Sequence, residues 1–494
     1  DQTTAAGRML ARIDTDHRLL ALTRIALRRG GAPADVAARL AVVTPALQRD
    51  PGLIFDRAGW LRRAGRLSEA QAMLVTDDLD AGMVSDADRW LTLRLEIARA
   101  AWRSGAHETA WKILASHQVR AAAAMPARPL SERLLYSDTE FLAGWIALRK
   151  LGRAETALRH FRNLRAAVTT PVSQARADYW SGRAALALNQ PAAARVFFTA
   201  AATHPDYFYG QLAAAQIGQA LVLNAAASPT PAPSAFDSFR SESRVRAAAA
   251  LGEIGAHGLQ TVFLKQLAET TDNTQRLAML AALGGRISRP DAGVYAGKAA
   301  RSGGELALLG AAFPRLALPS SLSDRTTLIH AITRQESQFD PRARSSAGAV
   351  GLMQLLPSTA AEQAGKLGLP FSAGGLTSDP IFNVTLGSAY FNRLRTSFGG
   401  NWPLAIAAYN AGPGNARRIM ATIGDPRDAS VDAIDWIESI PFSETRTYVQ
   451  RVIENAVVYD RLMPQTATFG SANPVMTYLA PSAPLPLTFP GPLP

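Results

Sequence analysis

The stretch AITRQESQFDPRARSSAGAVGLMQLLP, residues 331–357, places one glutamate at the end of an otherwise apolar helical pattern. Leu328, Ile332 and Glu336 are spaced four residues apart and therefore share one face of the predicted helix. Pro341 ends this helix, which places Glu336 in its last turn. Burial and the negative end of the helix dipole both favour the protonated carboxyl, and a raised pKa suits a general acid. The alternative is an ordinary helix-terminal glutamate that reaches into solvent.

The residues after this helix supply further candidates. Two glycines, among them Gly351, imply a close backbone approach, either to a neighbouring helix or to a ligand. They precede an expected short apolar helix that carries Gln354 and that Pro357 ends. Thr359 and Glu362 have the spacing of a capping box, which predicts that Thr359 starts the next helix.

Two later segments also carry polar groups next to apolar helical patterns. LAIAAYNAGPG, residues 404–414, ends an apolar helix at Tyr409, which could equally be a core aromatic with its hydroxyl at the surface. In IPFSETRTYVQRVIENAVVYDRL, residues 440–462, Ser443 is the expected N-cap. Glu444 then falls in the first helical turn, where an ionised carboxylate is favoured.

The first 220 residues or so repeat a helix, a short turn with Gly or Asn-Gln, and a second alanine-rich helix. The tryptophans that mark the repeat are separated by 42, 43 and 35 residues, and they are Trp60, Trp102, Trp145 and Trp180. This spacing predicts helical hairpins that stack into a solenoid. The tryptophans could stack on carbohydrate, but in such repeats they more often fill the seam between helices.

Composition excludes several classes of protein. The chain of 494 residues has no cysteine, so disulfides, thiolate metal sites and cysteine nucleophiles are excluded. Its seven histidines are dispersed without the spacing of metal ligands, and we expect no metal and no organic cofactor. The net charge of +12 comes from scattered arginines, which predicts solvated helix faces rather than a nucleic-acid site. We expect no transmembrane segment.

Three motifs together resemble those of the soluble lytic transglycosylases. They are RQESQFDPRARSSAGAVGLMQLLPSTA, AAYNAGPG and IPFSETRTYVQRV, in that order, and the resemblance covers about residues 317–463. It implies a mostly all-α protein with a hairpin superhelix, a helical linker and a catalytic domain like goose-type lysozyme. With a proline-rich break at residues 225–236 and eight prolines in the last 31 residues, the expected ranges are superhelix 1–225, linker 226–310, catalytic domain 311–464 and proline-rich extended tail 465–494.

The resemblance also implies a role for each candidate residue. Glu336 matches the single catalytic acid and base, and Tyr409 matches a tyrosine whose hydroxyl helps to hold that carboxyl. Leu356 stands where the family often carries methionine, whereas Asp340 stands where it often carries asparagine, and a turn before Pro341 explains Asp340. The other positions that match residues contacting or shaping the glycan groove are Ser345, Met353, Gln354, Asn410, Glu444 and Tyr448.

The implied activity is that of a lytic murein transglycosylase. Such an enzyme breaks the bond between N-acetylmuramic acid and N-acetylglucosamine and closes a 1,6-anhydro ring, so one carboxyl suffices. A muramidase that admits water to the same site is the nearest alternative, and a non-catalytic wall scaffold is another. Peptidoglycan strands are the expected partners, together with cell-wall proteins at the superhelix. The expected location is the periplasm.

Overall fold

The computed structural model describes residues 2–75, 84–119, 122–223 and 230–481. Secondary structure in these ranges consists of helices together with isolated bridges that join Val350 to Arg344 and to Leu355. The predicted all-α class is therefore confirmed for this part of the chain. Within the same ranges, no helix combines the length and the apolar character needed to cross a membrane.

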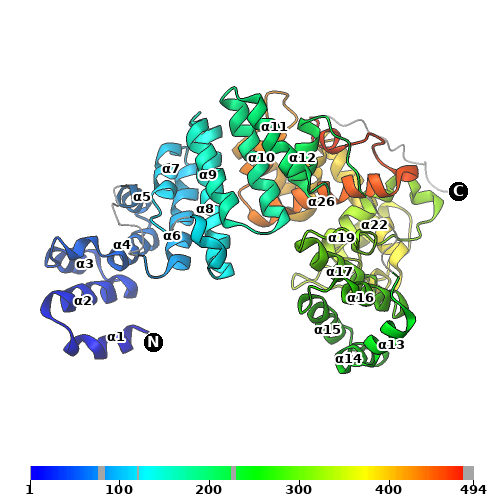
Figure 1. The fold of residues 1–494 in the computed structure, drawn as a ribbon, viewed down its shortest axis with the longest axis horizontal. Coiled ribbons are helices and arrows are strands. Elements are labelled where there is room, and N and C mark those ends of the chain that lie inside the picture. The colour runs from blue at the N-terminus through cyan, green and yellow to red at the C-terminus, as the bar shows by residue number, and fades with distance from the viewer. Residues whose placement is uncertain (1, 76–83, 120–121, 224–229, 482–494) are drawn as a thin grey trace. The chain divides into compact units, whose positions relative to one another are not determined.

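The chain divides into two compact units, and the first comprises Asp1–Thr169 and Arg176–Phe197. Its helices follow one another along the chain (Figure 1). They are α1 (Gln2–Met9), α2 (Thr15–Arg29), α3 (Pro33–Ala41), α4 (Pro51–Arg63), α5 (Leu67–Val75), α6 (Ala87–Arg103), α7 (His107–Ala115), α8 (Leu130–Arg149) and α9 (Ala154–Ala167). The division between the units falls within α10 (Pro171–Ala187) and α11 (Pro191–Ala202).

The predicted helical hairpins are present in the first unit. Helix α4 pairs with α5, α6 with α7, and α8 with α9. Each pair turns at a glycine with positive φ, at Gly65, Gly105 and Gly152, where a side chain would strain the backbone. Trp102 of α6 meets Trp145 of α8 edge to face, with ring centroids 5.6 Å apart. The tryptophans therefore fill the seams between hairpins, as the core interpretation predicts.

The second unit comprises Thr170–Ala175 and Phe198–Pro494. It begins with α12 (Phe208–Gln216) and continues into a group of six helices, the first five of which share an apolar core including Phe236, Leu264 and Leu283. The six are α13 (Pro233–Ser241), α14 (Ser243–Glu253), α15 (His257–Glu269), α16 (Thr274–Arg286), α17 (Pro290–Ser302) and α18 (Leu309–Ala312). We refer to α13–α18 as the linker helices.

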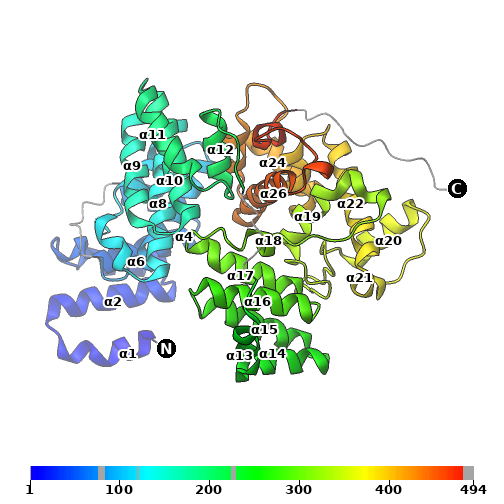
Figure 2. The same cartoon turned by 45° about the vertical axis from the view of Figure 1, so that its right-hand side comes forward.

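The candidate site lies in the helices that follow. They are α19 (Thr326–Glu336), α20 (Pro357–Lys366), α21 (Gly375–Ser378), α22 (Pro380–Ser397), α23 (Trp402–Ala411), α24 (Pro413–Ile423), α25 (Ala433–Ser439) and α26 (Ser443–Leu462). Helix α26 is central, because it packs against α19 and α23 and also against α12 (Figure 2). The second unit thus joins helices from widely separated parts of the sequence around α26.

Two of the expected domain ends fall on residues that lie outside the part of the chain that the structure describes. The expected boundary near residue 225 falls in residues 224–229, and residues 482–494 of the expected tail are likewise outside. The described part of the tail contains α27 (Val475–Tyr478). Tyr478 is fully buried against Trp402, with ring centroids 5.1 Å apart, and its hydroxyl donates to Asp460 at 2.7 Å. Within the second unit, this segment therefore packs against α23 and α26.

Candidate active site

Glu336 is the last residue of α19, as the sequence predicts. The helix is buried over Thr326–Arg334 and ends because the chain turns sharply after Ser337. Gln338 and Phe339 have φ values of 54° and 70°, a left-handed conformation that non-glycine residues seldom adopt. The Ser337 hydroxyl stabilises this turn, since it donates to the Thr333 carbonyl at 3.1 Å and accepts from the Phe339 N–H at 3.2 Å. The turn fixes the position of the adjoining carboxyl.

The environment of Glu336 raises its pKa to about 7, and burial is the main cause. A hydrogen bond from the Tyr448 hydroxyl lowers the pKa, whereas the negative charge of Glu444 raises it. Glu444 itself is exposed in the first turn of α26, as predicted. A carboxyl with a pKa near 7 can give up a proton and take one back near neutral pH.

Two tyrosines approach the site, and their contacts differ from those expected. The Tyr448 hydroxyl donates to Glu336 Oε1 at 2.5 Å, and the tyrosine is 4% exposed. The Tyr409 hydroxyl instead donates to the Met353 carbonyl at 2.8 Å. The contact with the carboxyl, expected of Tyr409, is thus made by Tyr448, because α26 packs directly on α19. Burial is the main cause that raises the pKa of Tyr409, and the negative charge of Glu336 raises it further. Tyr409 therefore lies close enough to Glu336 to interact with its charge.

The chain around Gln354 is a tight turn, so the expected short helix there is wrong. Gln354 has a φ of 47°, and its side-chain amide donates to the carbonyls of Ala343 at 3.0 Å and Gly351 at 2.9 Å. These bonds hold a left-handed residue that helical periodicity does not reveal. Pro357 begins the next helix instead of ending one, with Leu356 rather than Thr359 at the N-cap.

The close approach predicted at Gly351 is to a neighbouring segment. Its φ is 79°, and a Cβ there would lie 2.2 Å from both Asn383 Nδ2 and the Leu376 carbonyl. Asn383, fully buried on α22, accepts from the Met353 N–H at 2.9 Å and donates to the Val350 carbonyl at 3.1 Å. Sequence reasoning missed Asn383, because an isolated asparagine in a helical pattern carries no signal of such a role. The residue ties the Gln354 turn to α22.

The remaining predicted residues differ in their exposure. Met353 is fully buried, so its carbonyl rather than its side chain takes part in the site. Ser345 is exposed and its hydroxyl accepts from the Ala349 N–H at 3.0 Å, while Leu356 is 44% exposed. Asn410 is partly exposed at the end of α23. The structure thus brings Tyr448 onto Glu336 and Tyr409 onto Met353, while Ser345 and Leu356 lie on the surface.

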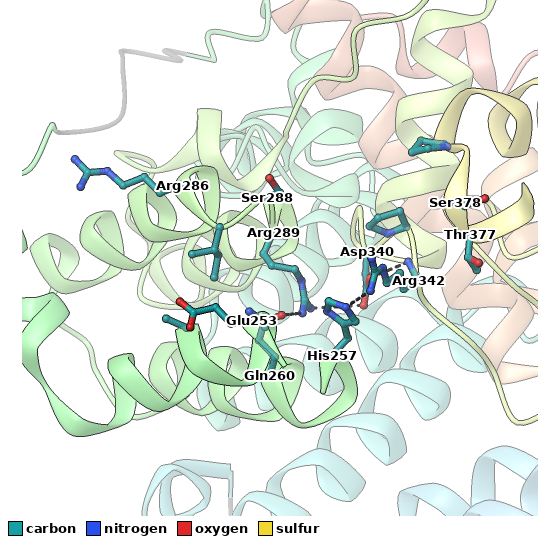
Figure 3. A pocket seen from close by; sticks show the side chains of 15 residues that line it. Glu253, His257, Gln260, Arg286, Ser288, Arg289, Asp340, Arg342, Thr377 and Ser378 are labelled. Carbon is teal, nitrogen blue, oxygen red and sulfur yellow. Dashed lines mark hydrogen bonds and ion pairs between the residues drawn. The ribbon is translucent and has the colours of Figure 1, made fainter. Parts of the chain in front are cut away.

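The loop after Glu336 also contacts the linker helices. Asp340 Oδ1 accepts from the Arg342 N–H at 2.9 Å, which confirms its turn role, and its Oδ2 lies 3.6 Å from Arg289 Nη2. Arg342 also forms a hydrogen bond with His257 of α15. Figure 3 shows these side chains converging beside a cavity of about 690 Å³. Contacts from residues outside the motifs therefore hold the loop that follows the acid.

The geometry around Glu336 defines a class of site. One partly buried carboxyl, hydrogen-bonded by a buried tyrosine in an all-helical unit, is suited to acid–base catalysis. Within the residues that the structure describes, no group of three or more histidines and carboxylates is placed to hold a metal ion.

Comparison with known proteins agrees with this class. Residues 321–430 match the family model of the transglycosylase SLT domain, and residues 439–467 match that of the soluble lytic transglycosylase helical domain. These matches confirm the predicted resemblance to the soluble lytic transglycosylase family. The second match lies on α26 and the residues just around it.

Individual relatives cover different parts of the chain. The soluble lytic murein transglycosylase of Escherichia coli K12 is 40% identical over 143 residues, which are 29% of this chain and 22% of the relative. Membrane-bound lytic murein transglycosylase D of the same strain is 32% identical over 137 residues, 26% of this chain and 29% of the relative. The matched segment thus spans about a fifth of the first of these relatives.

Solved structures resemble the chain over more of its length. The lytic transglycosylase Slt of Pseudomonas aeruginosa has a TM-score of 0.61 at 24% identity, covering 91% of this chain and 73% of that one. The 70 kDa soluble lytic transglycosylase of Escherichia coli has a TM-score of 0.50 at 22% identity, covering 94% and 81%. At these identities the resemblance concerns the fold.

Proposed function

We propose that this chain is a lytic transglycosylase that cleaves the β-1,4 bond between N-acetylmuramic acid and N-acetylglucosamine in peptidoglycan. The observation that carries the proposal is the Glu336 carboxyl, which has a pKa of about 7 and accepts a hydrogen bond from Tyr448 at 2.5 Å. The match of residues 321–430 to the SLT domain supports the choice of substrate.

In the first step, protonated Glu336 donates its proton to the glycosidic oxygen as the bond to muramoyl C1 breaks. Burial keeps a large fraction of the carboxyl protonated near neutral pH, which this step requires. Positive charge develops at C1, and the acetamido oxygen of the same sugar can stabilise it. The Tyr448 hydroxyl stabilises the carboxylate that forms, because it already donates to Oε1.

In the second step, the Glu336 carboxylate takes the proton of the muramoyl C6 hydroxyl. The C6 oxygen attacks C1 and forms the 1,6-anhydro ring, so the carboxyl ends the cycle protonated as it began. The nucleophile belongs to the substrate, so it is present at high effective concentration and no water is consumed. One carboxyl can therefore serve as acid and then as base.

The alternative is a muramidase in which water attacks C1. Glu444 favours this second candidate, because in the described part of the chain it is the other carboxylate whose charge acts on Glu336. Two carboxyl groups flanking the bond are the usual arrangement in hydrolases. Glu444 is exposed in the first turn of α26, so Glu336 is the partly buried carboxyl of the two, and the transglycosylase, which needs one carboxyl, is the better supported reaction.

We further propose that the predicted residues that solvent reaches line the glycan groove, namely Ser345, Gln354, Leu356, Asn410 and Glu444. The Tyr409 hydroxyl supports the Gln354 turn through its hydrogen bond to the Met353 carbonyl. The substrate places the protein in the periplasm, and the hairpins of the first unit can offer a surface to cell-wall proteins. Ser345 and Leu356 have the exposure that contact with an extended strand requires.

Mass spectrometry of fragments released from purified peptidoglycan tests the reaction. We expect muropeptides that are one water lighter than hydrolysis products and lack a reducing end. Hydrated reducing ends would establish the muramidase instead, and no fragments at all would indicate a non-catalytic wall protein. Glu336→Gln, which keeps the shape of the side chain and removes its acid, is the matched control.

A further inference from the structure

The seam between α23 and α26 contains a hydrogen bond that the proposed reaction does not use. Thr445 Oγ1 donates to Asn410 Oδ1 at 2.8 Å. Thr445 is 3% exposed, whereas Asn410 is only partly buried at the end of α23. A buried hydroxyl thus contacts the side-chain amide of a residue that solvent can reach.

This bond determines which end of the Asn410 amide is available. A primary amide has one oxygen that accepts and one nitrogen that donates two hydrogens, on opposite sides of the group. With the oxygen held by Thr445, the nitrogen must face away from α26. Within the described residues, Asn410 Nδ2 donates to no side chain or carbonyl. The structure therefore presents an unused donor pair at an accessible position.

The donor lies next to the residues of the candidate site. Thr445 is three residues before Tyr448 on α26, so both side chains emerge from one face of the helix. The Tyr448 hydroxyl contacts Glu336, and Asn410 directly follows Tyr409, whose hydroxyl bonds to the Met353 carbonyl. Both partners of the Thr445–Asn410 bond are therefore one turn or less from groups that contact the acid or the Gln354 turn.

We propose that Thr445 is a positioning residue that orients the Asn410 amide so that Nδ2 donates to an oxygen of the bound glycan. The inference rests on the proposed function, since it assigns the amide to the same substrate. Without the Thr445 hydroxyl, the amide can rotate and present its oxygen, which cannot donate to a sugar hydroxyl or an acetamido carbonyl. The effect of Thr445 on the substrate then passes entirely through Asn410.

The test compares Thr445→Val with Thr445→Ser. Valine has nearly the shape of threonine and lacks the hydroxyl, whereas serine retains it. Affinity for purified, solubilised glycan strands is measured in the inactive Glu336→Gln background, and kcat and KM are measured with Glu336 intact. We expect Thr445→Val to weaken binding about 10-fold and to raise KM, as for the loss of one good hydrogen bond. Thr445→Ser should change either value by less than about 2-fold.

A double-mutant cycle separates positioning from a general structural role. In an Asn410→Ala background, Thr445→Val should have no further effect on glycan affinity, because its only route is absent. An equal loss in both backgrounds, or unchanged affinity of Thr445→Val, would overturn the inference. If Thr445→Val lowers the melting temperature, the Asn410→Ala variant alone still tests the inference. A glycan affinity of Asn410→Ala equal to that of the parent would also overturn the inference. Anhydro products from the parent would show that the proposed function survives such a failure.

Discussion

Glu140 in the first unit is buried and Glu336 in the second is partly buried, yet their pKa values shift in opposite directions. Burial raises the pKa of Glu140, but hydrogen bonds from His117 and His160 outweigh it and bring the pKa to about 2. Burial also raises the pKa of Glu336, where a single tyrosine hydroxyl opposes it, and the pKa reaches about 7. Burial has the same sign at both sites, so the number of donors decides the outcome.

The contacts of Glu140 show why it is a structural residue. His117 Nε2 lies 3.0 Å from one carboxylate oxygen and His160 Nδ1 lies 2.7 Å from the other. His117 Nδ1 accepts from the Val119 N–H, so a neutral His117 carries its hydrogen on Nε2 and donates to Glu140. Both oxygens are satisfied, and the ionised form is stable. Glu336 accepts a hydrogen bond from Tyr448 on one oxygen, and its other oxygen can contact the substrate. Its ionised form is therefore less stabilised than that of Glu140.

The largest effect on activity is expected from removing the carboxyl of Glu336 in the second unit. Glu336→Gln should lower kcat for release of anhydro fragments by about 10³-fold or more, because no proton can then reach the leaving oxygen. Activity is measured by mass spectrometry of digests over a time course. Activity within 10-fold of the parent would contradict the assignment of the acid.

The same variant sharpens the comparison through stability. A folded pKa of about 7 against a reference of 4.5 means that stability present below pH 4.5 is lost as the pH rises toward 7. Glu336→Gln escapes this loss, worth on the order of 3 kcal/mol. Its melting temperature should therefore exceed that of the parent at pH 8, and the difference should shrink toward pH 4.

A loss of stability is expected from changing Glu140 in the first unit. Glu140→Gln should lower the free energy of unfolding by about 2–3 kcal/mol, since the glutamine amide leaves a buried histidine donor without an acceptor. Urea unfolding at pH 7, followed by tryptophan fluorescence, measures the change. The parent should lose the stability contributed by Glu140 as the pH falls from 4.5 toward 2, because the folded pKa is the lower one.

Glu96→Gln is the matched control for Glu140→Gln. Glu96 lies 3.1 Å from Arg62, and both side chains are more than 40% exposed. Such a surface ion pair contributes less than about 1 kcal/mol. Equal losses for the two variants would show that the donors around Glu140 do not stabilise the fold.

A smaller effect is expected from Tyr448→Phe. Its hydroxyl donates to Glu336 at 2.5 Å, and loss of one hydrogen bond to a charged group should lower kcat about 10- to 100-fold. The same bond lowers the pKa of Glu336, so its removal should move the alkaline limb of the pH–rate profile upward. Tyr409→Phe, which loses a bond to the Met353 carbonyl, should leave that limb nearer its place. A larger shift of the alkaline limb for Tyr409→Phe than for Tyr448→Phe would show that Tyr409 holds the carboxyl of Glu336.

The smallest effect is expected from Glu444→Gln. The charge of Glu444 raises the pKa of Glu336, so its removal should move the alkaline limb downward by a fraction of a pH unit. Glu444 is exposed, and salt should therefore screen the interaction and produce a similar shift in the parent. A pH–rate series at low and high ionic strength checks both. An upward shift would contradict the like-charge interaction.

Sequence reasoning predicted the features of the two units that depend on residues close together in the chain. Helical periodicity predicted the hairpins, and the proline after Glu336 predicted where α19 ends. It failed at Gln354, where a left-handed turn is held by hydrogen bonds to Ala343 and Gly351. It also did not reveal the environment of Glu140, because its two histidine partners lie 23 and 20 residues away.

The sequence by itself thus determined the all-helical class, the position of the acid at a helix end and the first-turn position of Glu444. These features follow from helix propensity and chain termination, which act over a few residues. Only the tertiary structure decided that Tyr448 rather than Tyr409 holds the carboxyl, and that Thr445 meets Asn410. Glu336 and Tyr448 are 112 residues apart, so their contact exists only because α26 packs on α19. The packing of α26 on α19 and α23 therefore sets which donors reach each buried group.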